Sequence, residues 1–398
     1  MGTRMSNQTN DDEKLFQVSQ KISALMQGLS IPKTNKEVIE LLRNYLGFTE
    51  AHCVEVMDYL LKEDLLISHD FNLRNQTALY SNAYSNPDSQ RSMLLDLVRT
   101  DLYRRAIEQV ASKGSVIDVG CGSGILSMFS ASAGARKIYA IEATQVINLA
   151  QRLAKANNFS DKIEFINDYA QNVALNIKAD LIVSEWMGYF AIEEYMFDAV
   201  QVIRDRYLAK GGMMMPSAVN LYLAPVENRE LYYKKGPGFW NSTFLGYDFN
   251  VGVSQESAND VAKRCIVPME SLIALPALLL HFDCLKDNTS AFHFTKDVEW
   301  VSTRDAFLHG FCGYFDAILT DKITLSTSPM SPNTHWQQVY FPIKEIWVKK
   351  SDRIQLNITT NPGSICPTIA LKGSIIRDNS IIEMFHSKPF VDGFGHLG

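Results

Sequence analysis

Hydrophobic residues recur at helical spacing in the first part of the chain. Leu15, Val18 and Ile22 begin a pattern that continues to about residue 68, and intervals of three and four residues place such side chains on one face of a helix. The polar residues 1–12 are expected to be disordered. The pattern therefore predicts a small helical module with a disordered start over residues 1–75, and it contains no catalytic signature.

Strand-like and helical segments alternate after this module. A helical stretch over residues 86–112 precedes a strand-like run at 116–119, and further strands and helices follow in turn to about residue 209. This alternation is typical of a doubly wound, largely parallel sheet with helices on its faces. We therefore expect a Rossmann-like α/β domain over residues 76–216.

Beyond residue 216 the hydrophobic and polar positions alternate with a period of two. Runs such as 220–223 and 353–358, broken by Pro, Gly and Asn, predict strands. Residues 217–398 are therefore expected to form a mostly β domain, either a barrel or a sandwich. Residues 227–262 interrupt the alternation and are rich in aromatic side chains. They predict a protruding arm for self-association, with ordinary core aromatics as the alternative.

Composition narrows the class of protein. Of 398 residues, 46% are hydrophobic and 21% are charged, and the formal net charge is −6, as in ordinary globular proteins. This balance argues weakly against a nucleic-acid-binding surface and is compatible with cationic substrates. The six cysteines include no Cys-x-x-Cys pair, which favours free thiols over disulfides or a metal site. Without a signal core or a long apolar run, we expect a protein of the cytoplasm and/or nucleus with no membrane contact.

Glycines follow the first predicted strand at alternate positions, at Gly120, Gly122 and Gly124. Such glycines let a ligand approach the backbone, and the N–H groups at the start of the next helix face it. Ile125 stands where an NAD fingerprint requires glycine. Asp118 fits enzymes that use S-adenosylmethionine, and Glu142 ends the next strand, where an acid binds ribose hydroxyls. The pattern favours S-adenosylmethionine over NAD, and a tight turn without a ligand would leave Glu142 unexplained.

Two glutamates, Glu185 and Glu194, bracket a segment that reads SEWMGYFAIEEYM. Carboxylates on one tight loop can clamp a guanidinium, whose N–H donors match them in fork geometry. The segment follows a strand-like run at 180–184, and ligands of open α/β sheets bind at the carboxyl ends of strands. The alternative is a solvated loop with two surface glutamates.

This segment resembles the double-glutamate hairpin of protein arginine methyltransferases and matches the pattern Ser-Glu-x-Met-Gly…Glu-x-Met. The family spacing, with Met196 following, selects Glu194 and leaves Glu193 as an outward neighbour. A threonine-histidine-tryptophan sequence at 334–336 matches another motif of the family. The resemblance covers about residues 78–398 and is closest to the type I branch. It implies a Rossmann-like domain, a β-barrel domain and a homodimer formed through the arm.

The resemblance implies three groups of site residues. The catalytic group is Glu185, Glu194, His335 and Asp96. The substrate-binding group is Tyr189, Trp336, Met93, Met196 and Tyr84. The cofactor-binding group is Tyr80, Arg99, Asp118, Gly120, Gly122, Gly124, Glu142, Ala170, Gln171 and Glu185. A pair between His335 and Asp96 would offer a proton exit, with a purely structural ion pair as the alternative.

Three positions depart from the family pattern. Gln171 stands where Glu is common, Gln90 where His is frequent, and Ser81 where Phe commonly follows Tyr80. These departures concern the lid over the cofactor. The reaction itself does not depend on them.

The resemblance implies methyl transfer from S-adenosylmethionine to arginine nitrogens of proteins, with monomethylarginine and asymmetric dimethylarginine as products and without a metal. Histone tails and Gly-Arg-rich RNA-binding proteins are the expected substrates. A catalytically silent paralogue that acts as a scaffold or regulatory subunit is the main alternative, and the intact motifs disfavour it. A small-molecule methyltransferase is a third possibility, which the paired glutamates weaken.

Overall fold

The computed structural model describes residues 87–193, 195–249, 262–362 and 367–387. The chain divides into two units, Met1–Leu79 and Tyr80–Gly398, and every described residue belongs to the second. The predicted helical module lies outside the described residues, as do Tyr80, Tyr84 and Glu194.

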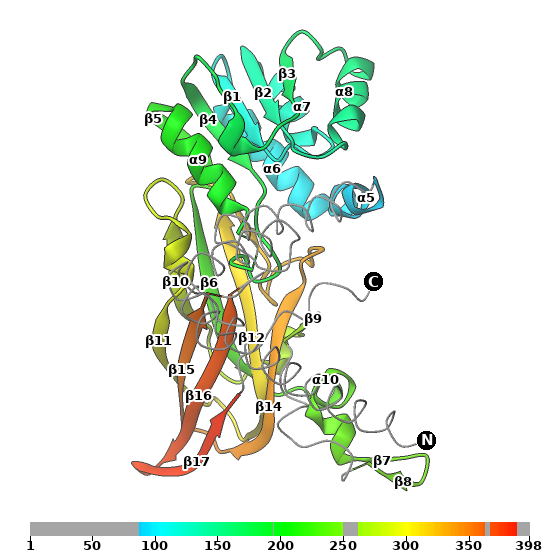
Figure 1. The fold of residues 1–398 in the computed structure, drawn as a ribbon. Helices are drawn as coiled ribbons and strands as arrows, with labels where there is room; N and C mark the ends of the chain where they lie inside the picture. Colours follow the sequence, from blue (N-terminus) through cyan, green and yellow to red (C-terminus); the bar gives the residue numbers. More distant parts are fainter. Residues whose placement is uncertain (1–86, 194, 250–261, 363–366, 388–398) are drawn as a thin grey trace, which may run out of the picture. The chain divides into compact units, whose positions relative to one another are not determined.

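A parallel sheet of five strands with surrounding helices forms the first domain of the described chain (Figure 1). Its elements are α5 Pro87–Leu95, α6 Leu97–Val110, β1 Ser115–Val119, α7 Ile125–Ser132, β2 Lys137–Ile141, α8 Ile147–Ala156, β3 Ile163–Ile166, η1 Ala170–Asn172, β4 Ala179–Ser184, α9 Phe197–Tyr207 and β5 Leu208–Met215. The strand order is β3-β2-β1-β4-β5, with parallel pairing throughout. The order reverses between β1 and β4, and ligands of such sheets bind beyond the strand ends at this reversal.

The central strand β1 shows why this part of the chain folds as it does. All of its residues are buried, and Val116 and Ile117 are fully enclosed. A strand that is buried along its whole length is typical of a parallel sheet that helices cover on both faces. The prediction of a Rossmann-like domain is confirmed.

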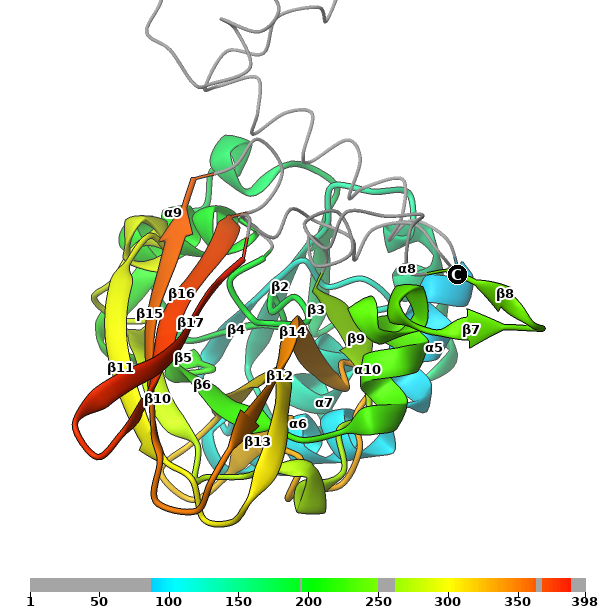
Figure 2. The same ribbon diagram turned by 90° about the horizontal axis from the view of Figure 1, so that it is seen from below.

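Antiparallel strands form the second domain. One sheet has the order β10-β6-β12-β14-β9, with β13 paired to β12, and the other has the order β11-β15-β16-β17. The elements are β6 Ala218–Val226, β9 Lys263–Cys265, η3 Met269–Ser271, β10 Ala277–Asp283, η4 Thr289–Phe292, β11 Thr295–Val301, β12 Ala306–Ile318, β13 Thr324–Ser326, β14 Gln338–Val348, β15 Arg353–Asn361, β16 Thr368–Arg377 and β17 Ser380–His386. Leu308 of β12 and Ile354 of β15 belong to one core, so the sheets enclose a shared interior (Figure 2).

The aromatic segment after β6 forms a separate projection. It comprises α10 Arg229–Lys235, η2 Pro237–Asn241, β7 Thr243–Phe244 and β8 Tyr247–Asp248. The β7–β8 hairpin extends away from the two sheets (Figures 1 and 2). Trp240, Phe244 and Tyr247 are exposed there, Tyr247 to 73%. We call residues 229–249 the arm. Among the described residues, no helix is long and apolar enough to cross a membrane.

Candidate functional site

The carboxyl ends of β1 and β4 bring two predicted sites together. Val119 and Ser184 are paired partners in these strands, and the Ser184 hydroxyl donates to the Val119 carbonyl at 2.7 Å. The next residues along the chain are Gly120 and Glu185. The glycine run and the first glutamate therefore begin side by side at the point where the strand order reverses.

The backbone of the glycine run is held by Glu142. Gly120 and Gly122 have φ angles of +71° and +52°, which glycine adopts without strain. The Gly122 N–H donates to Glu142 Oε2 at 3.0 Å, and the Thr144 N–H donates to Oε1 at 2.8 Å. Glu142 is thereby fixed at the edge of the run, where we expected an acid for the ribose hydroxyls.

Gln90 of α5 closes over the same run. Its Oε1 accepts from the Ser123 N–H at 2.9 Å, and a Cβ at Gly122 would lie 2.6 Å from that oxygen. Gln90 is only 5% exposed. Gln90 departs from the family pattern and was not among the expected site residues, although its place one helical turn before Met93 was a signal.

Asp118 is a buried carboxylate near the end of β1. Its Oδ2 accepts from the Ser127 hydroxyl at 2.6 Å, and its Oδ1 has no partner among the described residues. Burial raises the pKa of Asp118 to about 7, because desolvation disfavours the charged form. The group is therefore positioned as an acceptor with unused capacity.

Arg99 and Glu185, which we assigned mainly to different ligands, contact each other. Arg99 Nη2 lies 2.8 Å from Glu185 Oε2, and Arg99 Nε lies 3.2 Å from it. The two side chains are only 7% and 9% exposed. Glu185 Oε1 accepts from the Met187 N–H at 3.1 Å. This carboxylate thus already binds a guanidinium, the group that we expected the substrate to supply.

Asp96 connects the second domain to the start of α6. Its Oδ1 accepts from the Arg99 N–H at 3.0 Å as an N-cap. Its Oδ2 accepts from the His335 N–H and from His335 Nδ1, both at 2.8 Å. Burial raises the pKa of Asp96, but the hydrogen bonds from His335 and Arg99 outweigh it, and the net pKa lies below the ordinary value. The two residues thus form the pair that we expected.

Trp336 supports the hairpin from the barrel side. Its indole N–H donates to the Met187 carbonyl at 2.9 Å, and its ring packs edge-on against Phe315. Only 1% of Trp336 is exposed, so its faces are covered by protein atoms. We assigned it to the substrate wall, and in the structure its contacts are with the protein.

The hairpin after Glu185 packs onto the second domain. Phe190 is buried against Phe341, and its N–H donates to Glu193 Oε2 at 3.2 Å. Glu193 is 8% exposed, so our expectation that it points outward is wrong. The Phe190 N–H draws this carboxylate inward. Tyr189 is half-buried, and Arg264 of β9, which the sequence analysis did not find, donates to its hydroxyl at 2.6 Å.

The remaining assigned residues lie around this centre. Met196 precedes α9, and a Cβ at Gly120 would collide with its methyl group. Met93 is half-buried on α5. Ala170 is buried and Gln171 is exposed, both on η1 after β3.

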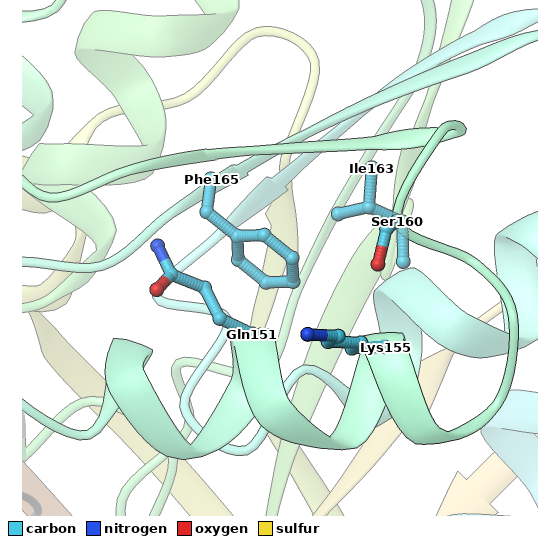
Figure 3. Close-up of a pocket in the computed structure, with 5 residues that line it drawn as sticks. All are labelled: Gln151, Lys155, Ser160, Ile163 and Phe165. Atoms are coloured by element: carbon cyan, nitrogen blue, oxygen red, sulfur yellow. The ribbon is translucent and has the colours of Figure 1, made fainter.

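A cavity of about 310 Å³ lies between α8 and β3 (Figure 3). Its lining residues are Gln151, Lys155, Ser160, Ile163 and Phe165. None of them was assigned a role. In the part of the chain that the structure describes, no three His, Cys, Asp or Glu side chains gather as a metal site would require.

Known proteins match the chain in both domains. The family described as arginine methyltransferase oligomerization subdomain matches residues 217–368, and the family of ribosomal protein L11 methyltransferase matches residues 99–207. Protein arginine N-methyltransferase 1 of Schizosaccharomyces pombe is 36% identical over 294 residues, which are 71% of this chain and 84% of that protein. The chain belongs to the protein arginine N-methyltransferase family. The Dictyostelium discoideum protein arginine N-methyltransferase 1 is 34% identical over 279 residues, 68% of this chain and 81% of that protein.

Solved structures of the family share this fold. The Trypanosoma brucei protein arginine methyltransferase 1 enzyme–prozyme heterotetrameric complex with S-adenosylhomocysteine has a TM-score of 0.69 and 26% identity, covering 77% of this chain and 100% of that chain. Arabidopsis thaliana protein arginine methyltransferase 10 has a TM-score of 0.68 and 30% identity, covering 77% and 99%. The resemblance inferred from the sequence motifs is confirmed.

Proposed function

We propose that this chain transfers a methyl group from S-adenosylmethionine to guanidinium nitrogens of arginine residues in proteins. The observation that carries the proposal is the contact between the Arg99 guanidinium and Glu185, next to Gly120. The Glu185 carboxylate binds a guanidinium at 2.8 Å. Glu185 follows β4 directly and lies next to the glycine run, at the point where the strand order reverses. The two reactants would therefore meet at one strand end, which is the positioning that methyl transfer needs.

The residues at the strand ends fit S-adenosylmethionine. Asp118 has an oxygen without a partner among the described residues, and the backbone at Gly120 and Gly122 has left-handed φ angles that leave it open to a ligand. Glu142, Asp118, Arg99 and the glycine run would hold the cofactor, with Ala170 and Gln171 at its adenine. When bound, S-adenosylmethionine supplies a methyl group on a sulfonium centre.

Glu185 and Glu194 would activate the substrate. A guanidinium is a poor nucleophile because it stays protonated, with a pKa above about 12, and its lone pairs are delocalised. Carboxylates that bind two of its nitrogens draw the positive charge towards themselves. The third nitrogen then keeps more electron density for the reaction. Tyr189 would stack on the cation and contribute ~0.5–2 kcal/mol.

His335 and Asp96 would accept the proton that the methylated guanidinium loses. His335 Nδ1 contacts the Asp96 carboxylate, so Nε2 is the ring nitrogen left to exchange a proton. The lowered pKa of Asp96 keeps that carboxylate ionised at neutral pH, where it stabilises a protonated imidazole. A structural role for the pair predicts the same contact, and the pH profile of a His335→Gln variant separates the two roles.

The proposed products are monomethylarginine and asymmetric dimethylarginine. Met93 and Met196 are flexible side chains that the family resemblance assigns to the reacting centre, and they would yield the space that a second methyl group needs on the same nitrogen. Bulky residues at these positions would redirect the outcome. The chain is proposed to act in the cytoplasm or nucleus on histone tails or Gly-Arg-rich proteins.

Mass spectrometry of a methylated histone or Gly-Arg-rich peptide tests the proposal. We expect arginine methylation, with the neutral loss of asymmetric dimethylarginine dominant among dimethylated products. If the neutral loss of symmetric dimethylarginine dominated, the type I assignment would be overturned and the proposed arginine methylation would stand. The absence of any transfer by a protein that binds cofactor would favour a catalytically silent paralogue.

A further inference from the structure

Positive side chains gather at strand β9, beside the hairpin, without an ion-pair partner among the described residues. Lys263 and Arg264 belong to β9, and Lys235 Nζ donates to the Arg264 carbonyl at 2.9 Å. None of these three side chains forms an ion pair with a described residue, whereas seven other arginines do. Those seven are Arg91, Arg99, Arg104, Arg204, Arg304, Arg353 and Arg377.

The strand pairing directs Arg264 towards the hairpin. Arg264 lies opposite Val339 of β14, and directly opposed residues of antiparallel strands share one face of the sheet. Val339 is completely buried in the shared core. Arg264 lies on that same face, at its exposed edge, and reaches Tyr189.

Arg264 holds Tyr189 through two contacts. Its Nη1 donates to the Tyr189 hydroxyl at 2.6 Å, and its guanidinium carbon lies 4.6 Å from the centre of the ring. The other cation–ring distances among the described residues run from 5.5 to 5.9 Å. A guanidinium has five N–H donors in a planar fork, and only one donor of Arg264 has a partner in the described part of the chain.

We infer that Arg264 is a specificity-determining residue, which binds an aspartate or glutamate side chain close to the target arginine of the protein substrate. The inference rests on the proposed function, because Tyr189 stands on the hairpin between the two glutamates of the proposed clamp. The guanidinium of Arg264 is fixed beside this hairpin by its two contacts with Tyr189. Its unused donors match a carboxylate in fork geometry.

A set of peptides with a single arginine tests this inference. The reference peptide has only neutral neighbours, and its relatives carry one Asp or one Lys at each position on either side of the arginine. Binding in the presence of S-adenosylhomocysteine and methyl transfer are measured separately. We expect the best Asp peptide to exceed the neutral one by about two- to fivefold in affinity and in kcat/KM, mostly through KM. The preference should weaken as salt rises.

Three substitutions test whether Arg264 causes the preference for the Asp peptides. Arg264→Gln should remove the Asp preference, Arg264→Lys should keep part of it, and Arg264→Glu should shift it to the Lys peptides. In all three, the neutral peptide should lose less affinity than the best Asp peptide, because only the Asp peptide gains from Arg264. Arg152→Gln, at an exposed position of α8, removes the same charge elsewhere and should leave the preference unchanged.

Each outcome decides the matter. An Asp preference that survives in Arg264→Gln, or that is absent from the unmodified protein, overturns the inference. An equal loss of binding for all peptides in Arg264→Gln also overturns it, because Arg264 then only holds Tyr189 in place. An Asp preference in binding without any methyl transfer would support the inference and overturn the proposed function alone.

Discussion

Glu185 and Asp118 are carboxylates at neighbouring strand ends, and their surroundings differ. Glu185 has the Arg99 guanidinium at 2.8 Å, which compensates its charge in a place where water is largely excluded. Asp118 has one hydroxyl donor, Ser127, and is completely buried. The first group is expected to act through its charge, and the second changes its protonation state near neutral pH.

Glu185→Gln should lower methyl transfer by about ten- to hundredfold, since a hydrogen bond to a charged group contributes roughly 1.5–3 kcal/mol. The free energy of unfolding should fall by a similar amount, because buried Arg99 loses its counter-charge. Urea unfolding and transfer of a labelled methyl group measure the two effects. Glu164→Gln is the control, because Glu164 pairs with Lys137 and its side chain is about half exposed. It should lower the free energy of unfolding by under about 1 kcal/mol. If Glu185→Gln retained more than a tenth of the methyl-transfer activity of the unmodified protein, the assignment of Glu185 to the clamp would be contradicted.

Asp118 gives stability a definite dependence on pH. Its folded pKa of about 7 exceeds the unfolded value of about 3.9, so between these values the folded chain binds more protons than the unfolded chain. The free energy of unfolding should therefore fall as pH rises from about 4 to about 7. Between pH 5 and pH 7 this contribution amounts to about 2 kcal/mol.

Asp118→Asn should remove that part of the pH dependence. Urea unfolding without cofactor, compared at several pH values, measures it. Asp161→Asn, at an exposed position, serves as the control and should leave the profile unchanged. An identical profile for Asp118→Asn and the unmodified protein would show that Asp118 does not titrate in this range.

At the scale of elements, the segment between β13 and β14 joins the two domains. His335 contacts Asp96 before α6, and Trp336 contacts Met187 on the hairpin after β4. Both contacts cross from the β domain to the parallel sheet. The position of the hairpin therefore depends on the β domain as well as on β4.

Trp336→Phe should weaken this connection. The substitution keeps an aromatic ring but leaves the Met187 carbonyl without its donor, at a cost of about 1–3 kcal/mol. We expect a lower melting temperature and a lower kcat, because the hairpin carries the proposed clamp. Trp347→Phe is the matched control, since Trp347 is 44% exposed and makes no hydrogen bond through its indole among the described residues. Equal effects of the two substitutions would rule out a special role for Trp336.

The sequence and the structure agree where the signal is local. Periodicity predicted the alternating elements, and the glycine run and the hairpin were assigned from residues close together in the chain. The contacts of Arg264 with Tyr189 and of Arg99 with Glu185 join residues 75 and 86 positions apart, and local patterns do not encode such pairs. The expectation for Glu193 failed for a related reason, since packing of Phe190 on Phe341 buries the turn.

At the scale of the whole molecule, the arm and the first two described helices are among the elements that expose apolar groups. The arm exposes Phe244 and Tyr247, and Leu95 and Leu97 at the junction of α5 and α6 are 70% and 74% exposed. Surfaces of this kind mark protein contacts. The match of residues 217–368 to an oligomerization subdomain supports an oligomer, and we propose a homodimer formed through the arm.

Replacing Phe244 and Tyr247 together with Ser should convert dimers to monomers and reduce turnover. Both side chains are exposed, so the fold should persist, as circular dichroism can verify. Sedimentation velocity measures the association state. Ser substitution of exposed Ile381 and Met384 on β17 provides a control of equal apolar loss outside the arm. A monomeric unmodified protein with full turnover would refute the proposed assembly.

The ion pair between Arg99 and Glu185 bears on kinetic order. While Arg99 occupies Glu185 Oε2, an incoming arginine competes with a guanidinium that is already in place. Arg99 would bind the carboxylate of S-adenosylmethionine, which the family resemblance implies as its ligand, and Glu185 would then be free to bind the substrate arginine. We therefore expect S-adenosylmethionine to bind before the peptide substrate. In steady-state terms, S-adenosylhomocysteine should compete with the donor and inhibit noncompetitively with respect to the peptide.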